Sequence, residues 1–129
     1  MELLKVEDAE VRRPPAPNSP TITVYFGGEE GGPDVGLLKV SVPVGARMGE
    51  HVHAGSDVIL TGLTGRAQII KGEEVAEIGP GDAVLVGKEE GVGLANPGDE
   101  VAEVLVAVGP ANFVAAVRGM PAAVTSDVH

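Results

Sequence analysis

Two histidines separated by one residue, His51 and His53, are the clearest candidates for chemistry in this chain. The 129 residues include three histidines and no cysteine. In an extended strand, residues i and i+2 point to the same face, with Cα atoms about 7 Å apart. Both imidazoles can therefore reach one metal ion. The pair predicts a shared metal ion or, without one, two polar groups that line a cavity and bond to water or to each other.

Asp57 is the candidate for a third metal ligand, four residues after His53. With the two histidines it would form the two-His-one-carboxylate set that leaves coordination positions open in iron(II) oxygenases. Strand alternation opposes this arrangement, because a regular strand sends Val58 inward and Asp57 outward. A bulge or register shift is needed to turn Asp57 inward. Two imidazoles alone would hold a divalent ion weakly, since a catalytic zinc site uses three protein ligands.

Arg47 and Gln68 are the candidate ligand-pocket residues. In a regular strand Arg47 shares a face with His51, and an inward guanidinium would bind a ligand carboxylate through two hydrogen bonds. The alternative is an arginine near the strand start that pairs with a surface acid. Gln68 follows the turn at Gly65. Because the turn interrupts the alternation, the side chain of Gln68 could point either into the cavity or out toward solvent. A divalent ion (Fe, Mn, Ni or Zn) is the expected cofactor. No organic cofactor is expected, because the glycines form no phosphate-binding strand–loop–helix unit.

The composition limits the classes of partner. Lys plus Arg number 9 and Asp plus Glu number 19, which gives a net charge of −10. Such a surface repels nucleic-acid backbones and anionic membranes, so neither is an expected partner. The lack of cysteine excludes disulfides, thiolate metal sites and iron–sulfur clusters. No apolar run approaches the ~20 residues of a membrane span. The N-terminus is a poor signal peptide, so we expect a cytoplasmic protein.

Short β-type segments, separated by turns that contain Gly and Pro, occupy most of the chain. The pattern predicts an all-β sandwich or closed barrel over residues 21–118, because turn signals recur about every 8–12 residues. Residues 1–20 are expected to form an arm with a Pro-rich linker, which can be neither helix nor central strand. Asn112 can cap a short helix that ends at Gly119. The segment 119–129 is expected to be a disordered tail.

Two motifs, within about residues 35–108, resemble those of the cupin family. The first consists here of Gly45, five residues, His51-Val52-His53 and a final Gly65. The second covers residues 79–96, with Gly81 and Asn96 at matching positions. The resemblance implies a double-stranded β-helix, or jelly-roll barrel, with both histidines facing its hollow. Small cupins commonly pair through terminal strands, so it also implies a homodimer to which the 1–26 arm would contribute.

Three departures from the motifs bear on function. The resemblance implies a metal site built from two His and one Glu of the first motif and one His of the second. Here Val58 stands at the Glu position and Val92 at the second-motif His position. Gly87 replaces the proline of the second motif. Two of the family's four ligand positions therefore hold apolar residues that cannot coordinate a metal.

The resemblance implies a wide range of functions, because oxygenases, isomerases, lyases and binding proteins share this fold. The first expectation is a small-molecule ligand in the barrel cavity, with a weakly held divalent metal at His51 and His53. The second is a metal-dependent oxygenase or isomerase that acts on a small acidic substrate. In that enzyme Asp57 would complete the metal site and Arg47 would anchor the substrate. The third is a degenerate barrel with a structural or regulatory role.

Overall fold

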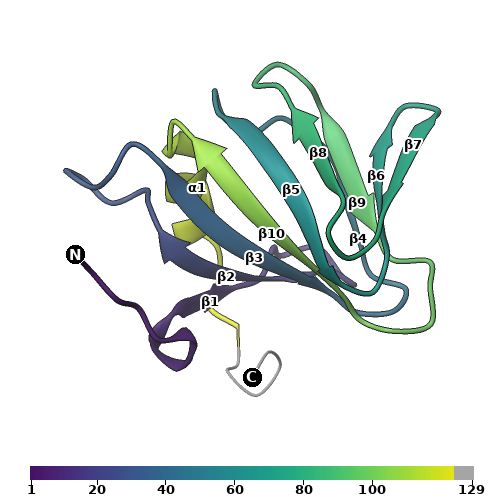
Figure 1. Cartoon of the computed structure of the whole chain (residues 1–129), viewed down its shortest axis with the longest axis horizontal. Coiled ribbons are helices and arrows are strands. Elements are labelled where there is room, and N and C mark those ends of the chain that lie inside the picture. Colours follow the sequence, from purple (N-terminus) through teal and green to yellow (C-terminus); the bar gives the residue numbers. More distant parts are fainter. Residues whose placement is uncertain (124–129) are drawn as a thin grey trace.

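The computed structural model describes residues 1–123 as two antiparallel sheets and one short α-helix (Figure 1). The larger sheet has the strand order β1-β2-β3-β10-β5-β8, and the smaller has the order β4-β9-β6-β7. The elements are a 3-10 turn at Val6–Asp8, β1 (Glu10–Arg12), β2 (Thr21–Phe26), β3 (Gly36–Val42), β4 (Arg47–His51), β5 (Asp57–Thr64), β6 (Ala67–Lys71), β7 (Glu74–Ile78), β8 (Ala83–Val86), β9 (Val92–Ala95), β10 (Ala102–Gly109) and α1 (Asn112–Arg118). The all-β jelly-roll prediction and the short C-terminal helix are confirmed.

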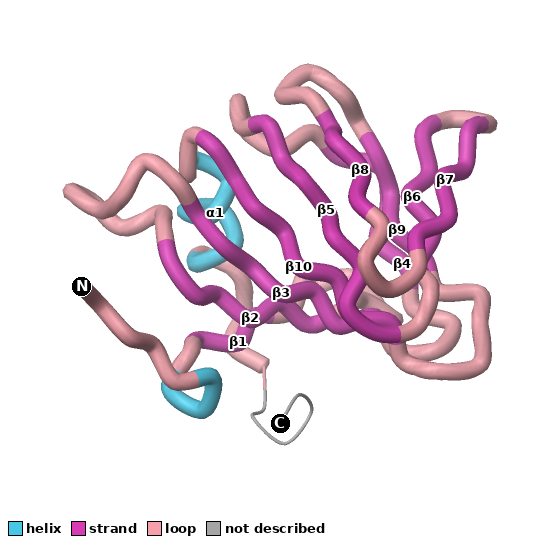
Figure 2. Tube along the Cα trace, in the orientation of Figure 1, coloured by secondary structure: helices cyan, strands magenta, loops and turns pink. Residues whose placement is uncertain are grey.

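Alternation along the central strands places the core between the two sheets. Figure 2 shows β3, β10 and β5 side by side in the larger sheet, and β10 pairs with both neighbours. Val40 of β3 and Val104 of β10 are register partners, and both are buried. Lys39 and Glu103 lie on the opposite face and form an ion pair of 3.5 Å. This period of two sends every second residue of β3 and β10 into the core.

Helix α1 packs against β2, β3 and β10 through the fully buried Val114. The expected cap by Asn112 is wrong, because the N-cap position is Ala111 and no side-chain cap hydrogen bond forms there. The amide of Phe113 instead donates to Ser56 Oγ at 3.2 Å. A residue from the loop before β5 thus satisfies one of the free amides at the helix start. No helix in residues 1–123 is long and apolar enough to cross a membrane.

The two terminal segments lie side by side. In the arm expected over residues 1–20, β1 pairs with β2 of the same chain. The segment expected as a tail, 119–129, hydrogen-bonds to β1 as far as Ala123, whose amide donates to the carbonyl of Val11 at 2.9 Å. Residues 124–129 of that expected tail lie outside the described residues. The outer edge of β1 is therefore covered by this chain's own C-terminal segment.

Candidate ligand and metal site

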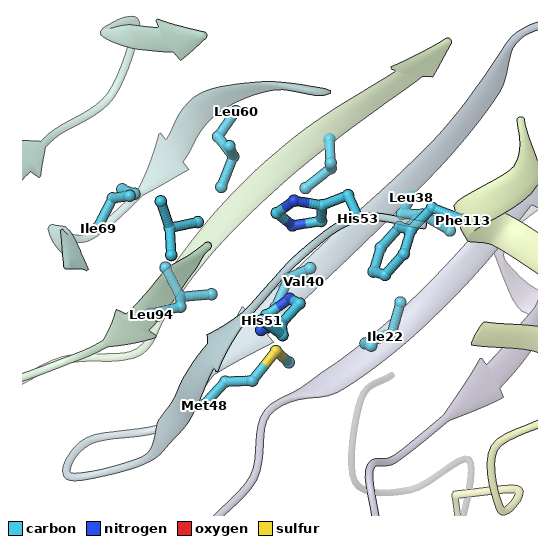
Figure 3. A pocket seen from close by; sticks show the side chains of 13 residues that line it. Ile22, Leu38, Val40, Met48, His51, His53, Leu60, Ile69, Leu94 and Phe113 are labelled. Carbon is cyan, nitrogen blue, oxygen red and sulfur yellow. The ribbon is translucent and has the colours of Figure 1, made fainter. Parts of the chain in front are cut away.

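A cavity of about 40 Å³ lies between the two sheets, and both histidines line it (Figure 3). Aliphatic side chains from both sheets form most of its wall, and Met48, His51, His53 and Phe113 complete it. None of these lining residues, all within the described part of the chain, carries a carboxylate, an ammonium or a guanidinium group. A charged ligand would therefore leave water without gaining a counter-charge, which is energetically costly.

A bulge in β4 decides which of its side chains reach the cavity. Met48 pairs with Leu94 of β9, whereas His51 pairs with Val92, so three steps along β4 match two along β9. The extra residue reverses the alternation, and Met48 and His51 face the same side. Gly93 lies opposite the bulge, where an added Cβ would come within 2.8 Å of the Met48 carbonyl oxygen. The bulge therefore depends on the missing side chain of Gly93.

His51 is held in one tautomer by the same bulge. Its Nδ1 lies 2.8 Å from the carbonyl oxygen of Gly49. A carbonyl only accepts hydrogen bonds, so Nδ1 of the neutral ring carries the proton and Nε2 keeps its lone pair. The ring is half-buried and stacks on Phe113, with centroids 6.1 Å apart and an interplanar angle of 18°. Nε2 is thus the atom available to a ligand or a metal.

His53 lies past the end of β4, in a turn where Ala54 and Gly55 have φ angles of 46° and 81°. Only 5% of the residue is exposed. Its ring centroid lies 4.8 Å from that of His51 and 4.8 Å from that of Phe113. Its buried Nδ1 has no hydrogen-bond partner among residues 1–123. Burial, and secondarily the neighbouring His51, lowers the pKa of His53 to about 4, so this imidazole is neutral at pH 7.

The structure does not bring Asp57 to the histidines. Strand β5 runs without a bulge at its start, so Val58 points inward with 1% exposure and Asp57 points outward. The Asp57 carboxylate accepts a hydrogen bond from the backbone amide of Lys88 at 3.0 Å. Within residues 1–123, no three His, Cys, Asp or Glu side chains are grouped to hold a metal ion. The register shift needed for Asp57 to bind a metal is absent from this part of β5.

Arg47 and Gln68 also lie away from the cavity. The expectation that Arg47 shares a face with His51 is wrong, because the bulge between them shifts the alternation by one residue. Arg47 is exposed, and its neighbour Met48 lines the cavity instead. Gln68 is on the outer face of β6, since Ile69 is the β6 residue that lines the cavity. Neither polar side chain is placed to bind a ligand beside the histidines.

Met48 and Phe113 line the site, although the sequence did not indicate either residue. Met48 is three residues before His51, a spacing that puts two side chains on opposite faces of a regular strand. Phe113 comes from α1, at the far end of the chain, and contacts both imidazole rings. Asn96, which matched the second motif, has a structural role: its side-chain amide donates to the carbonyls of Val42 and Glu100 at 2.9 and 2.8 Å.

The sequence profile of the cupin domain matches residues 38–108. This chain belongs to the cupin family. The matched range extends from β3 to β10 and includes both histidines and the bulge in β4. No curated protein matches the chain at a significant level.

Solved structures with the same architecture support this assignment. A cupin 2 conserved barrel protein from Salinispora arenicola is 21% identical, with a TM-score of 0.69 over 92% of this chain and 96% of that chain. The polyketide cyclase RemF from Streptomyces resistomycificus is 18% identical, with a TM-score of 0.71 over 84% and 79% of the two chains. The TT1209 protein from Thermus thermophilus is 29% identical, with a TM-score of 0.55 over 59% and 72%. At these identities the likeness shows the fold.

The residues of this cupin fit the family's divalent metal poorly. Val58 and Val92 occupy the implied positions of the other two ligands, with exposures of 1% and 6%. The donors left in the cavity, within residues 1–123, are two imidazoles and one thioether. A divalent ion bound there would keep nearly its full charge in an apolar hollow. These residues therefore do not support a catalytic step through such an ion.

Proposed function

We propose that this cupin is a binding protein whose interior cavity holds a small ligand against His51 and His53, with a divalent metal bound weakly at most. The observation that carries the proposal is the juxtaposition of two imidazoles, 4.8 Å apart, in an otherwise apolar cavity. A buried polar atom without a partner is unfavourable, and His53 Nδ1 has none among residues 1–123. A ligand that offers the site a hydrogen-bond donor or a vacant coordination position would bind there.

The size of the cavity limits the ligand. A volume of about 40 Å³ accepts only a few non-hydrogen atoms. A groove of about 460 Å³ lies between β7 and β8, and Ile69 and Val92 line both spaces. A larger molecule could occupy the groove and reach the histidines by displacing one of these two side chains. The groove is within the usual size range of small-molecule sites. Lys71 and Glu90 form an ion pair of 2.8 Å at its rim.

The alternative, a metal-dependent oxygenase or isomerase on an acidic substrate, needs a third ligand and a carboxylate anchor. The residues expected in these roles, Asp57 and Arg47, both point away from the cavity. The geometry therefore favours binding over catalysis of that kind. A barrel with only a structural role would bind neither a small molecule nor a metal, so the same experiment separates it from the proposal.

The test is a long-range ¹H–¹⁵N spectrum of the imidazoles during titration with small alcohols, amines and azoles, and with Zn²⁺ and Ni²⁺. We expect small ligands to shift the ring nitrogens of His51 and His53, and the shifts to disappear in His51→Gln and His53→Gln. Protein produced with added Fe, Mn, Ni and Zn should carry less than one equivalent of metal by mass spectrometry. Asp57→Ala should leave that content unchanged. Stoichiometric divalent metal that is lost in Asp57→Ala would contradict the proposal and restore the enzyme alternative.

A homodimer is the second part of the proposal, through the outer face of the larger sheet. The strand register aligns Leu85, Ile59, Ala107 and Leu37 in one apolar row across β8, β5, β10 and β3. Leu85 is 67% exposed and Ile59 46% exposed. With a net charge of −10, two copies approach with least repulsion through apolar faces. The arm is less suited to pairing, because β1 is already covered by residues 121–123.

A further inference from the structure

We propose that the groove between β7 and β8 is a docking site for an extended, cationic peptide segment of another protein, which adds a strand to the free edge of β8. The inference goes beyond the proposed function, since neither histidine takes part in it. Strand β8 ends the larger sheet and β7 ends the smaller sheet, and both line the groove of about 460 Å³. Figure 1 shows the two strands at the end of the molecule that lies away from both chain termini.

The free edge of β8 presents backbone groups that need hydrogen-bond partners. The amide of Gly62 donates to the carbonyl of Asp82 at 2.9 Å, and β5 and β8 continue in the same register from there. In an antiparallel ladder, hydrogen-bonded pairs alternate with pairs that are not hydrogen-bonded. The N–H and C=O groups of Val84 and Val86 therefore point to β5, and those of Leu85 point to the free edge. In the described part of the chain, no strand pairs with that edge.

The sequence of β8 does not protect this edge. Native edge strands usually carry a charge, a proline or a bulge that prevents pairing with another chain. The strand Ala83–Val86 contains only apolar residues, and its register with β5 is regular. The first amide along the edge with a side-chain partner is that of Gly87, which donates to the carboxylate of Glu90 at 2.9 Å. An unprotected apolar edge of this kind favours the addition of a strand.

The groove also has room for side chains of the added strand. Ala76 of β7 pairs with Ile69 and shares its inward-facing side of the smaller sheet, yet Ala76 is exposed. Across the groove Val84 points inward like its register partner Leu60, but it is only half-buried. The two sheets therefore do not close on each other at this end. Every second side chain of an added strand would point between them and bury apolar surface against Ala76 and Val84.

The charges of the groove favour a cationic partner. Lys71, Glu74 and Glu90 line it, and Lys71 is already paired with Glu90 at 2.8 Å. Glu74 is thus the lining charge that a lysine or arginine of the partner would neutralise. A second copy of this chain is less suited to the same edge, because each copy brings a net charge of −10.

The experiment measures binding of a synthetic peptide to the full chain by fluorescence anisotropy. The probe is a fluorescein-labelled peptide of alternating valine and threonine with arginines at one end, and we expect saturable binding that weakens at high salt. Two control peptides are N-methylated at every second residue, one in each frame, so that each loses the hydrogen-bond donors along one edge. At least one of them should bind about tenfold more weakly, because the carbonyl of Leu85 would lose its donor. A peptide with glutamates in place of the arginines should also bind more weakly.

Two pairs of variants test the edge and the charge. Leu85→Pro removes the amide that faces the groove and leaves the hydrogen bonds to β5, whereas Leu85→Ala removes the same side chain and keeps the amide. We expect about a tenfold loss of affinity in Leu85→Pro and a much smaller loss in Leu85→Ala. Glu74→Gln should weaken binding and reduce its salt dependence. Glu77→Gln should do neither, because Glu77 pairs with Arg66 and does not line the groove. Thermal unfolding monitors the fold of each variant.

Hydrogen exchange of wild type adds a readout that needs no variant. The amide of Leu85 should exchange at least about tenfold more slowly when the peptide is saturating. Equal binding of the unmodified peptide and both N-methylated peptides would overturn the inference, and so would unchanged exchange at Leu85. Self-association that is lost in Leu85→Pro but kept in Leu85→Ala would assign the edge to a second copy and would overturn it as well. These outcomes leave the proposed function standing, because that function is tested at the ring nitrogens of the two histidines.

Discussion

The buried imidazole of His53 should make this protein lose stability between pH 6.5 and pH 4. Its folded-state pKa is about 4, against 6.5 for an unperturbed histidine. Above pH 6.5 the ring is neutral in both folded and unfolded states, and the stability is fully present. Below pH 6.5 the unfolded chain binds a proton that the folded protein does not take up until about pH 4. The unfolded state then binds more protons, so the free energy of unfolding falls as the pH falls.

The magnitude follows from the difference between the two pKa values. Each pKa unit corresponds to 1.36 kcal/mol, so a difference of 2.5 units corresponds to roughly 3 kcal/mol of lost stability below pH 4. About 1.4 kcal/mol of it should be lost by pH 5.5, before most carboxylates begin to titrate. Total stabilities of domains are about 5–15 kcal/mol, so this loss is readily measured.

The assay is urea unfolding of the chelator-treated protein at pH 8, 6.5 and 5.5. His53→Leu removes the titrating group at similar volume and also removes an unpaired buried nitrogen, so its stability should change little between these pH values. His51→Gln is the matched variant: it should keep most of the pH dependence, because burial lowers the pKa of His53 more than His51 does. An equal loss of stability in wild type and His53→Leu between pH 8 and 5.5 would show that the reasoning is wrong.

Three further predictions concern the bulge, the lost ligand and the apolar sheet face. Gly93→Ala should destabilise the fold by roughly 1–3 kcal/mol in urea unfolding, because the added Cβ would lie 2.8 Å from the Met48 carbonyl oxygen. Gly49→Ala is the control and should be neutral, since its Cβ would face open space. Equal effects of the two substitutions would contradict the role given to Gly93 in the bulge. Val92→His should raise Zn²⁺ affinity at least about tenfold in competition titrations by supplying a third imidazole, and no gain would refute the assigned register. Leu85→Glu should give a monomer in light scattering while Val75→Glu on the other sheet stays dimeric; a dimer that survives Leu85→Glu would exclude this interface.

Strand alternation alone was enough to predict the orientation of the Asp57 side chain. A regular strand sends Val58 inward and Asp57 outward, and β5 does so. The same rule failed for Arg47, because β4 contains one extra residue opposite β9. The one local sign of a bulge is Gly49 in the middle of β4, because an isolated glycine within a strand often marks one, but it does not fix which residues pair. The bulge is set by pairing with β9 and by the space that Gly93 leaves, and these contacts join segments about forty residues apart.

The sequence by itself determined the all-β architecture, the cupin likeness and the pair of imidazoles on one segment, because turn residues and period-two alternation are local properties of the backbone. It also determined that Val58 and Val92 could not bind a metal. Only the tertiary structure decided that Met48 joins the histidines and that Phe113 covers them. Those two facts depend on a bulge and on helix packing, which arise from contacts between distant segments rather than from any local pattern.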